Sequence, residues 1–276
     1  MVTLPAVAIL GAGSMGGAIL SGLLGPGVTV DGGIRVTNRT EQKAAALRSD
    51  GVASFSTESD PRANLAAVSG AKIVLVAVKP AMIPDLLREV GDALDPDAIV
   101  VSVAAGVTTQ TMEALLPESV GVLRAMPNTP AIVGRAVTGL SAGSWSTAVH
   151  LALATALFET VGTVVVVPEE RIDALSTISG SGPAYVFYLI EQFTATAMGL
   201  GFSPEEAATL VNTTFLGASE LLAASGKTPE ELRIQVTSPK GTTERAIAEL
   251  EKADLKRLFD KATAAALERA QELAEG

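Results

Sequence analysis

The chain has 276 residues, of which 48 % are hydrophobic and only 4 % aromatic, and its formal net charge is -10 at pH 7. This length suits one large or two ordinary domains, with a core built mainly from Ala, Val, Leu and Ile. The acidic balance disfavours nucleic acid and anionic membrane surfaces as partners, because binding to either draws on clustered Lys and Arg. A small anionic ligand in a locally positive pocket is not excluded.

The chain has no cysteine and a single histidine, His150. Disulfides, thiolate nucleophiles and Cys-ligated metals are therefore excluded. One histidine also rules out a multi-His metal cluster and disfavours a Ser-His-Asp relay, so we expect no metal site. His150 precedes an Ala- and Leu-rich run and is interpreted as a helix-surface residue.

The first 30 residues are rich in glycine and apolar residues, as a secretory signal would be. No Lys or Arg precedes this apolar run, however, and glycines interrupt it at 11, 13, 16 and 17. No uninterrupted apolar run of about 18 residues follows elsewhere. The sequence predicts a cytoplasmic protein without a membrane partner.

Short β-branched runs alternate with helical patterns over residues 1–166. The strand-like runs are residues 6–10, 34–38, 72–78, 98–103, 120–126 and 161–167. Helix-like segments between them are residues 14–24, 41–49, 80–93 and 108–116. Several strand-like runs are apolar on successive residues, which is typical of strands covered on both faces. We expect an N-terminal α/β domain of the Rossmann-like, doubly wound type.

Residues 167–276 read as a separate, all-α domain. The helical runs are residues 169–178, 183–199, 204–224, 229–235, 243–251 and 254–274. Ser203, Pro204 and Glu206 form a capping-box pattern at one of the starts. Residues 184–201 are apolar nearly all round, so this helix must be buried, and a partner chain would supply part of the cover.

Gly11, Gly13 and Gly16 follow the first predicted strand in the order GxGxxG. In this context the first glycine permits a tight turn, the second admits a pyrophosphate, and the third allows close helix packing. The amino terminus of the next helix, at Ser14 and Met15, would then face the phosphates. We expect a dinucleotide to bind here.

The identity of the dinucleotide depends on the end of the second predicted strand. Asp31 lies before that strand begins, and the strand ends in Asn38, Arg39 and Thr40. A guanidinium and a hydroxyl suit a 2′-phosphate, so NADPH is favoured, with NADH as the alternative. Arg39 can also be read as a solvated loop charge.

Two further loops follow predicted strands and should border the cofactor, because ligands gather at the carboxyl ends of parallel strands. One contains Ala77, Val78, Lys79 and Pro80, and the other contains Ala104 and Ala105. Lys79 can meet a phosphate, orient a substrate or cap strand-end carbonyls; the sequence leaves these roles open.

Five segments in order resemble the pyrroline-5-carboxylate reductase family. They are "GAGSMG" (11–16), "AVKP" (77–80), "RAMPNTP" (124–130), "SGSGPAY" (179–185) and "VTSPKGTT" (236–243). The resemblance implies reduction of the cyclic imine Δ1-pyrroline-5-carboxylate to L-proline with NAD(P)H, the last step of proline synthesis. It also implies a helical domain that interleaves with a second subunit, giving a homodimer within a larger oligomer such as a decamer.

The resemblance also implies roles for individual residues. The loop of Ser238, Gly241, Thr242 and Thr243 would hold the substrate carboxylate through backbone amides. The hydroxyls of Thr243 and Ser181 would hold the ring nitrogen, and Glu169 would lie near the substrate. Asn64 would lie beside the adenosine ribose. Asn128 would either contact the nicotinamide or only stiffen its turn, and Arg124 is interpreted as an ion-pair partner.

Lys240 departs from the resemblance, because the family usually has glycine at this position. If the position needs a positive φ, a lysine there carries strain of about 1 kcal/mol or more. Lys240 could instead add positive charge near the carboxylate, but tolerated variation is the favoured interpretation.

A cyclic imine eases a difficulty that the composition raises, since carbonyl reduction normally wants a proton donor beside the oxygen. An imine can bind already protonated, so the protein has only to position the two rings.

A related imine or β-hydroxyacid reductase is a second hypothesis, although residues 183–198 offer only Glu191 where such enzymes place Lys or Asp. A non-catalytic NADPH sensor is the third.

Overall fold

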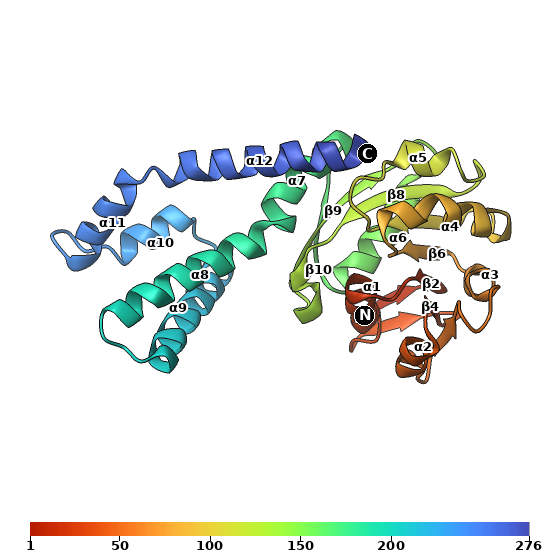
Figure 1. The fold of residues 1–276 in the computed structure, drawn as a ribbon, viewed down its shortest axis with the longest axis horizontal. Coiled ribbons are helices and arrows are strands. Elements are labelled where there is room, and N and C mark those ends of the chain that lie inside the picture. Colours follow the sequence, from red (N-terminus) through yellow and green to blue (C-terminus); the bar gives the residue numbers. More distant parts are fainter. Residues whose placement is uncertain (276) are drawn as a thin grey trace. The chain divides into compact units, whose positions relative to one another are not determined.

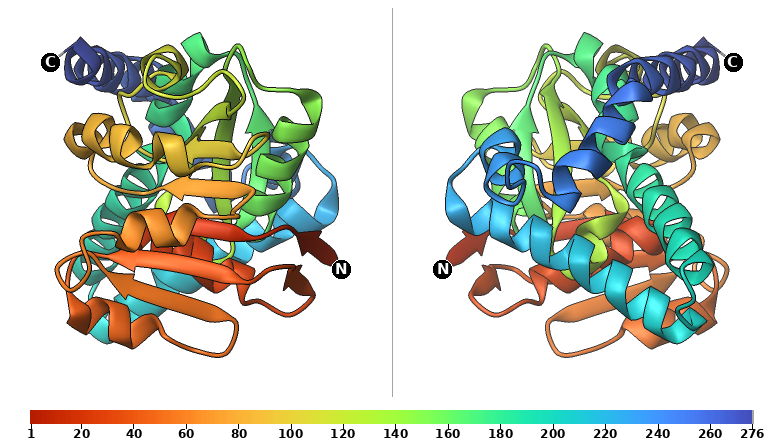
Figure 2. Two further views of the ribbon diagram at one scale, coloured as in Figure 1. Left: turned by 90° about the vertical axis from the view of Figure 1, so that its right-hand side faces the viewer. Right: turned by 90° about the vertical axis from the view of Figure 1, so that its left-hand side faces the viewer.

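The structure, a computed structural model, describes residues 1–275 and forms two compact units (Figures 1 and 2). The first unit contains residues 1–181 and the end of the chain from Ala266, and the second contains Gly182–Ala265. The boundary after residue 166 stays a prediction. Among the described residues we find no helix both long and apolar enough to cross a bilayer.

An eight-stranded sheet forms the centre of the first unit, in the order β10-β9-β8-β7-β6-β2-β4-β5. Its strands are β2 (Val7–Leu10), β4 (Ile34–Asn38), β5 (Val52–Ser56), β6 (Ile73–Val76), β7 (Ile99–Ser102), β8 (Gly121–Met126), β9 (Ala136–Ala142) and β10 (Gly162–Val166). All neighbours are parallel except β8 and β9. A separate parallel pair joins β1 (Val2–Leu4) to β3 (Val28–Val30).

Helices cover both faces of this sheet, as the sequence predicts. They are α1 (Ser14–Leu23), α2 (Glu41–Leu47), α3 (Ala63–Val68), α4 (Ile83–Val90), α5 (Thr109–Glu113) and α6 (Ala148–Glu159). Ile9 joins a core cluster with residues of α1 and α6, whereas its neighbours Ala8 and Leu10 join a second cluster with residues of α3, α4 and α5. Successive strand residues point to opposite faces, so β2 is buried from both sides.

All the predicted strands are present, but the sequence analysis missed β1, β3, β5 and β9. Strand β9 illustrates why, because its sequence AVTGLSA mixes small and polar residues. Thr138 and Ser141 are nevertheless buried, and Leu175 fills the space beside Gly139. The surrounding structure, and not β-propensity, determines this strand.

His150 is not a surface residue, and its predicted exposure is wrong. It is only 8 % exposed in the third position of α6, where Thr147 accepts a hydrogen bond from the His150 amide and His150 Nδ1 accepts one from the Thr147 amide, both at 3.3 Å. The ring occupies the space that a side chain at Gly121 would need. His150 therefore serves in a helix cap.

The second unit is helical, as predicted. It contains α8 (Gly182–Gly199), α9 (Pro204–Ser225), α10 (Pro229–Gln235), α11 (Thr242–Lys252) and the first half of α12 (Leu255–Glu275). The Ser203 and Glu206 side chains form the expected capping box. In the single chain, α8 exposes Phe187, Tyr188 and Phe193, although its sequence predicts burial. A patch of large exposed apolar side chains marks a surface for another protein chain.

A tight turn separates α10 from α11 and contains the departure at Lys240. The Gly241 amide donates to the Ser238 carbonyl at 3.0 Å, Pro239 occupies the second position, and Lys240 has a φ of +62° at the third. Such a turn favours glycine at its third position. The positive φ on which the strain argument depends is thus confirmed, and whether Lys240 also adds useful charge stays a prediction.

We expect Lys240→Gly to be more stable than Lys240→Ala by about 1 kcal/mol, because only glycine adopts this left-handed conformation without a steric penalty. Both variants remove the same charge, so the comparison isolates the backbone. Denaturant unfolding at one fixed protein concentration measures the difference. Equal stabilities, or a more stable alanine variant, would contradict the strain.

Candidate active site

The order of strands places the first candidate site at the carboxyl end of β2. Strand β2 has β4 on one side and β6 on the other. From β2 the chain runs outward to β4 and β5 and then crosses back to β6 on the opposite side of β2. In an open parallel sheet this switch point forms the crevice in which ligands bind. The Gly11 turn follows β2 here, and the Ala77 loop follows β6.

The three glycines of this turn have distinct structural roles. Gly11 has a φ of +89°, and a Cβ on it would lie 2.8 Å from Val78 Cγ1. A Cβ on Gly16 would lie 2.8 Å from the Gly11 carbonyl oxygen, so α1 packs directly on the turn. Gly13, by contrast, has nothing within 4 Å of its Cβ position. The space beside Gly13 is open to a ligand.

The amino terminus of α1 faces this space without a protein cap. Gly13 is the N-cap residue, no side chain caps the helix, and the first turn has no acidic residue. Ser14 is exposed, while Met15 is partly buried against the core. Unpaired amides and the positive end of a ten-residue helix provide an anion site. An open Gly13 and an uncapped helix together fit a pyrophosphate.

The end of β4 holds the residues expected to choose between NADPH and NADH. Asn38 is buried, Thr40 caps α2, and the Arg39 side chain is 85 % exposed. Arg39 Nε donates to Glu58 Oε1 at 3.1 Å. A carboxylate from the end of β5 thus lies beside the end of β4. The sequence does not predict β5, so it gives no indication that Glu58 lies here.

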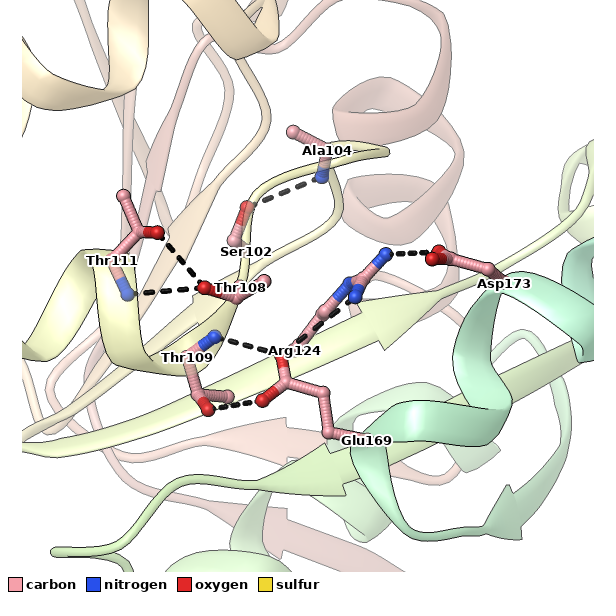
Figure 3. A network of polar contacts seen from close by, with 8 residues as sticks. All are labelled: Ser102, Ala104, Thr108, Thr109, Thr111, Arg124, Glu169 and Asp173. Atoms are coloured by element: carbon pink, nitrogen blue, oxygen red, sulfur yellow. Dashed lines mark hydrogen bonds and ion pairs between the residues drawn. The ribbon is translucent and has the colours of Figure 1, made fainter. Parts of the chain in front are cut away.

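The loops after β6 and β7 complete this edge of the sheet. Lys79 is exposed and is the N-cap residue of the short 3₁₀ helix Pro80–Met82. Its ammonium makes neither a hydrogen bond nor an ion pair within residues 1–272, whose side chains the structure describes. The capping of strand-end carbonyls by Lys79 is thus not observed, and its contact with a ligand stays a prediction. Ala104 is buried, with its amide bonded to Ser102 Oγ, and Ala105 is exposed (Figure 3).

Asn64 lies on α3, where its Nδ2 donates to Glu89 Oε2 at 3.1 Å. This bond orients the amide and leaves Asn64 Oδ1 as a hydrogen-bond acceptor. Its contact with a ribose stays a prediction.

Glu169 and Arg124 belong to a polar network that joins four elements of the first unit: α5, β8, the 3₁₀ helix Glu169–Arg171 and α7 (Figure 3). Arg124, on β8, is 4 % exposed and pairs with Asp173 at 2.6 Å and with Glu169 at 3.7 Å. The two Glu169 oxygens accept hydrogen bonds from the amide and hydroxyl of Thr109, at 2.7 and 2.5 Å. Arg124 is an ion-pair partner, as expected. Glu169 thus has a structural role, but each of its oxygens can accept a further hydrogen bond, so its contact with substrate stays a prediction.

Asn128 connects two of the motifs that carry the resemblance. Its Nδ2 donates to the Ser179 carbonyl and its Oδ1 accepts from the Val137 amide, both at 2.9 Å. The side chain is buried. The structure therefore supports the stiffened-turn interpretation, and a cofactor contact by Asn128 remains a prediction.

Ser181 follows a π-helical segment, Ser176–Gly180, at the end of α7 (Ile172–Leu175). Its amide donates to the Ser176 carbonyl at 2.9 Å. Such wide turns occur frequently at functional sites. Through Asn128, this turn is fastened to the loop after β8.

In the second unit, α11 begins with its amides unoccupied. Gly241 is its N-cap residue, no side chain caps it, and a Cβ on Gly241 would lie 2.9 Å from the Ser238 carbonyl. Thr242 and Thr243 form the exposed first turn. The free amides beside two hydroxyls suit a carboxylate, although Glu244 lies in the same turn and its carboxylate accepts from the Lys240 amide at 2.7 Å.

Two known families match separate parts of the chain. Residues 6–106 match the family described as "NADP oxidoreductase coenzyme F420-dependent". Residues 169–273 match "Pyrroline-5-carboxylate reductase dimerisation". The chain thus contains a dimerisation domain.

Relatives match over nearly the full length. A pyrroline-5-carboxylate reductase of Corynebacterium melassecola is 36 % identical over 271 residues, covering 97 % of this chain and 98 % of the relative. The structure of a Coxiella burnetii pyrroline-5-carboxylate reductase is 37 % identical, with a TM-score of 0.90 and coverage of 97 % and 98 %. The NADP-bound Plasmodium falciparum enzyme, at 22 % identity and a TM-score of 0.80 over 98 % of both chains, shares the fold. The chain belongs to the pyrroline-5-carboxylate reductase family.

Proposed function

We propose that this protein reduces Δ1-pyrroline-5-carboxylate to L-proline with NADPH, the last step of proline synthesis. The observation that carries the proposal is a full-length likeness to reductases of this name, 36 % identical over 271 residues. The two uncapped helix termini support it, because each suits one of the anionic groups that the reaction brings together.

The first unit would hold the cofactor. The amides of Ser14 and Met15 bind the pyrophosphate in the space beside Gly13, and Arg39 with Thr40 meets the 2′-phosphate. Lys79, Asn64 and the 104–105 turn border the rest of the molecule. When bound, NADPH supplies the hydride that reduces the imine carbon.

The loop 238–243 would hold the substrate. Its carboxylate accepts hydrogen bonds from the amides of Thr242 and Thr243, while the Thr243 hydroxyl meets the ring nitrogen, with Ser181 as a second hydroxyl. The imine binds already protonated, so no side chain has to act as a general acid. Orientation of the two rings is then the main contribution of the protein.

We also propose that the exposed apolar surface of α8 lies in a homodimer interface, and that dimers assemble further, for example into a decamer, in the cytoplasm. Phe187 and Tyr188 are each more than half exposed in one chain, at 65 % and 61 %. In this proposal the predicted domain of residues 1–166 binds the cofactor. The predicted domain of residues 167–276 binds the substrate and forms the dimer.

The direct test is oxidation of NADPH by purified, folded protein in the presence of pyrroline-5-carboxylate, with proline identified as the product. A panel of other imines and β-keto acids separates this activity from a related reductase. NADPH binding without turnover, and without any response to proline, would instead support a non-catalytic sensor.

We expect Gly13→Ala to weaken NADPH binding about tenfold or more, because the added Cβ enters the space of the pyrophosphate. The fold should be unaffected, since nothing lies within 4 Å of that Cβ. Gly17→Ala is the matched control, because Gly17 is equally uncrowded but lies one turn further along α1. Calorimetry measures both affinities; an equal effect at the two positions would contradict the proposed site.

We expect Thr243→Val to lower kcat/KM for pyrroline-5-carboxylate about tenfold, the value of one lost hydrogen bond in the transition state. Thr243→Ser keeps the hydroxyl and should retain most of the activity. Steady-state kinetics of the pair, with NADPH affinity measured alongside, shows whether the hydroxyl matters. Equal activity of the two variants would remove Thr243 from the site.

A further inference from the structure

An ion pair at the carboxyl end of β4 bears on the choice of cofactor. We infer that Glu58 limits the discrimination of this protein between NADPH and NADH, because it shares the Arg39 guanidinium with the 2′-phosphate. This inference rests on the proposed function and names a specificity-determining residue within it.

The backbone fixes Glu58 beside Arg39. Strands β4 and β5 are paired in register up to Asn38 and Ser56. Beyond them the Thr57 amide donates to the Asn38 carbonyl at 2.9 Å, and the Glu58 amide donates to the Arg39 carbonyl at 3.0 Å. Ser56 Oγ donates to that same carbonyl at 3.1 Å. Backbone hydrogen bonds therefore hold Glu58 at this strand end, in addition to its exposed ion pair.

The ion pair leaves part of the guanidinium free. Glu58 Oε1 accepts from Arg39 Nε, and the two terminal nitrogens have no hydrogen-bond partner among the described side chains, residues 1–272. Those nitrogens can still meet a phosphate in the forked geometry that arginine favours. Arg39 can thus serve Glu58 and a phosphate at the same time.

The carboxylates near this strand end differ in whether their cationic partner is also needed by the 2′-phosphate. Glu41, another carboxylate close to this strand end, is paired with Arg48 at 2.7 Å, and hydrogen bonding to Arg48 lowers the Glu41 pKa. The partner of Glu58 is Arg39 itself. A 2′-phosphate on Arg39 would therefore lie near a carboxylate that makes no second ion pair with the described side chains of residues 1–272. NADH presents a hydroxyl instead, which can donate to the carboxylate, as at the acidic residue of NAD sites.

The test compares dissociation constants of NADPH and NADH by calorimetry, without substrate, for the full-length protein and Glu58→Gln. We expect the ratio of the NADH to the NADPH dissociation constant to rise about threefold at low salt and less at high salt. Asp31→Asn is the matched control, because it removes one exposed charge at the amino end of β4 and should leave the ratio unchanged. In an Arg39→Gln background the rise should shrink.

An unchanged ratio would overturn the inference, and so would a falling one, which would mean that Glu58 positions Arg39 for the phosphate. Glu58→Ala repeats the measurement with the carboxylate removed in another way. A protein that shows the shift but does not reduce pyrroline-5-carboxylate supports this inference and counts against the proposed function. Failure of the unmodified protein to bind NADPH would overturn both.

Discussion

The close approach of α1 to the turn after β2 is the contact on which the first unit depends. A Cβ on Gly16 would lie only 2.8 Å from the Gly11 carbonyl oxygen, and 3.2 Å from Ala77 Cβ on the neighbouring loop. Any larger residue would push the helix away from the centre of the sheet. The same approach directs the first amides of α1 at the switch point between β2 and β6, so a packing constraint creates the ligand site.

A buried charge organises the opposite half of the sheet. Removing Arg124 from water is costly unless ion pairs and hydrogen bonds compensate. Asp173 and Glu169 provide them for the two terminal nitrogens, whereas Nε has no hydrogen-bond partner among the described residues. Glu169 in turn holds Thr109 at the start of α5. The network thereby fixes the segment that leads into the π-helical turn at Ser176–Gly180. Arg124, Glu169 and Asp173 are residue types that often form catalytic clusters, but here they support the turn that carries Ser181.

Sequence analysis could predict features that depend on neighbouring residues. Apolar runs locate the buried strands, and the capping pattern at Ser203 and Glu206 locates the start of α9. Burial and strand formation could not be predicted where they depend on contacts between residues far apart in the sequence. Burial of His150 depends on the absence of a side chain at Gly121, and β9 depends on Leu175 beside Gly139. Glu58 reaches Arg39 only because β5 pairs with β4, which no periodicity in either segment indicates.

In this protein, backbone amides at helix termini would bind anionic ligands, and few cationic side chains would be needed. A chain with a net charge of -10 can therefore act on a dinucleotide and an acid. Helices α2, α5, α6, α9 and α10 begin with a Ser or Thr whose side chain caps the first turn. Helices α1 and α11 begin instead at Gly13 and Gly241, without a side-chain cap. A serine or threonine at either position would occupy the amides that an anion needs. The amides carry only partial charges and exert their attraction at contact distance. A phosphate or a carboxylate therefore binds only where the backbone leaves room for it to contact the amides. The net charge of the protein surface can remain negative.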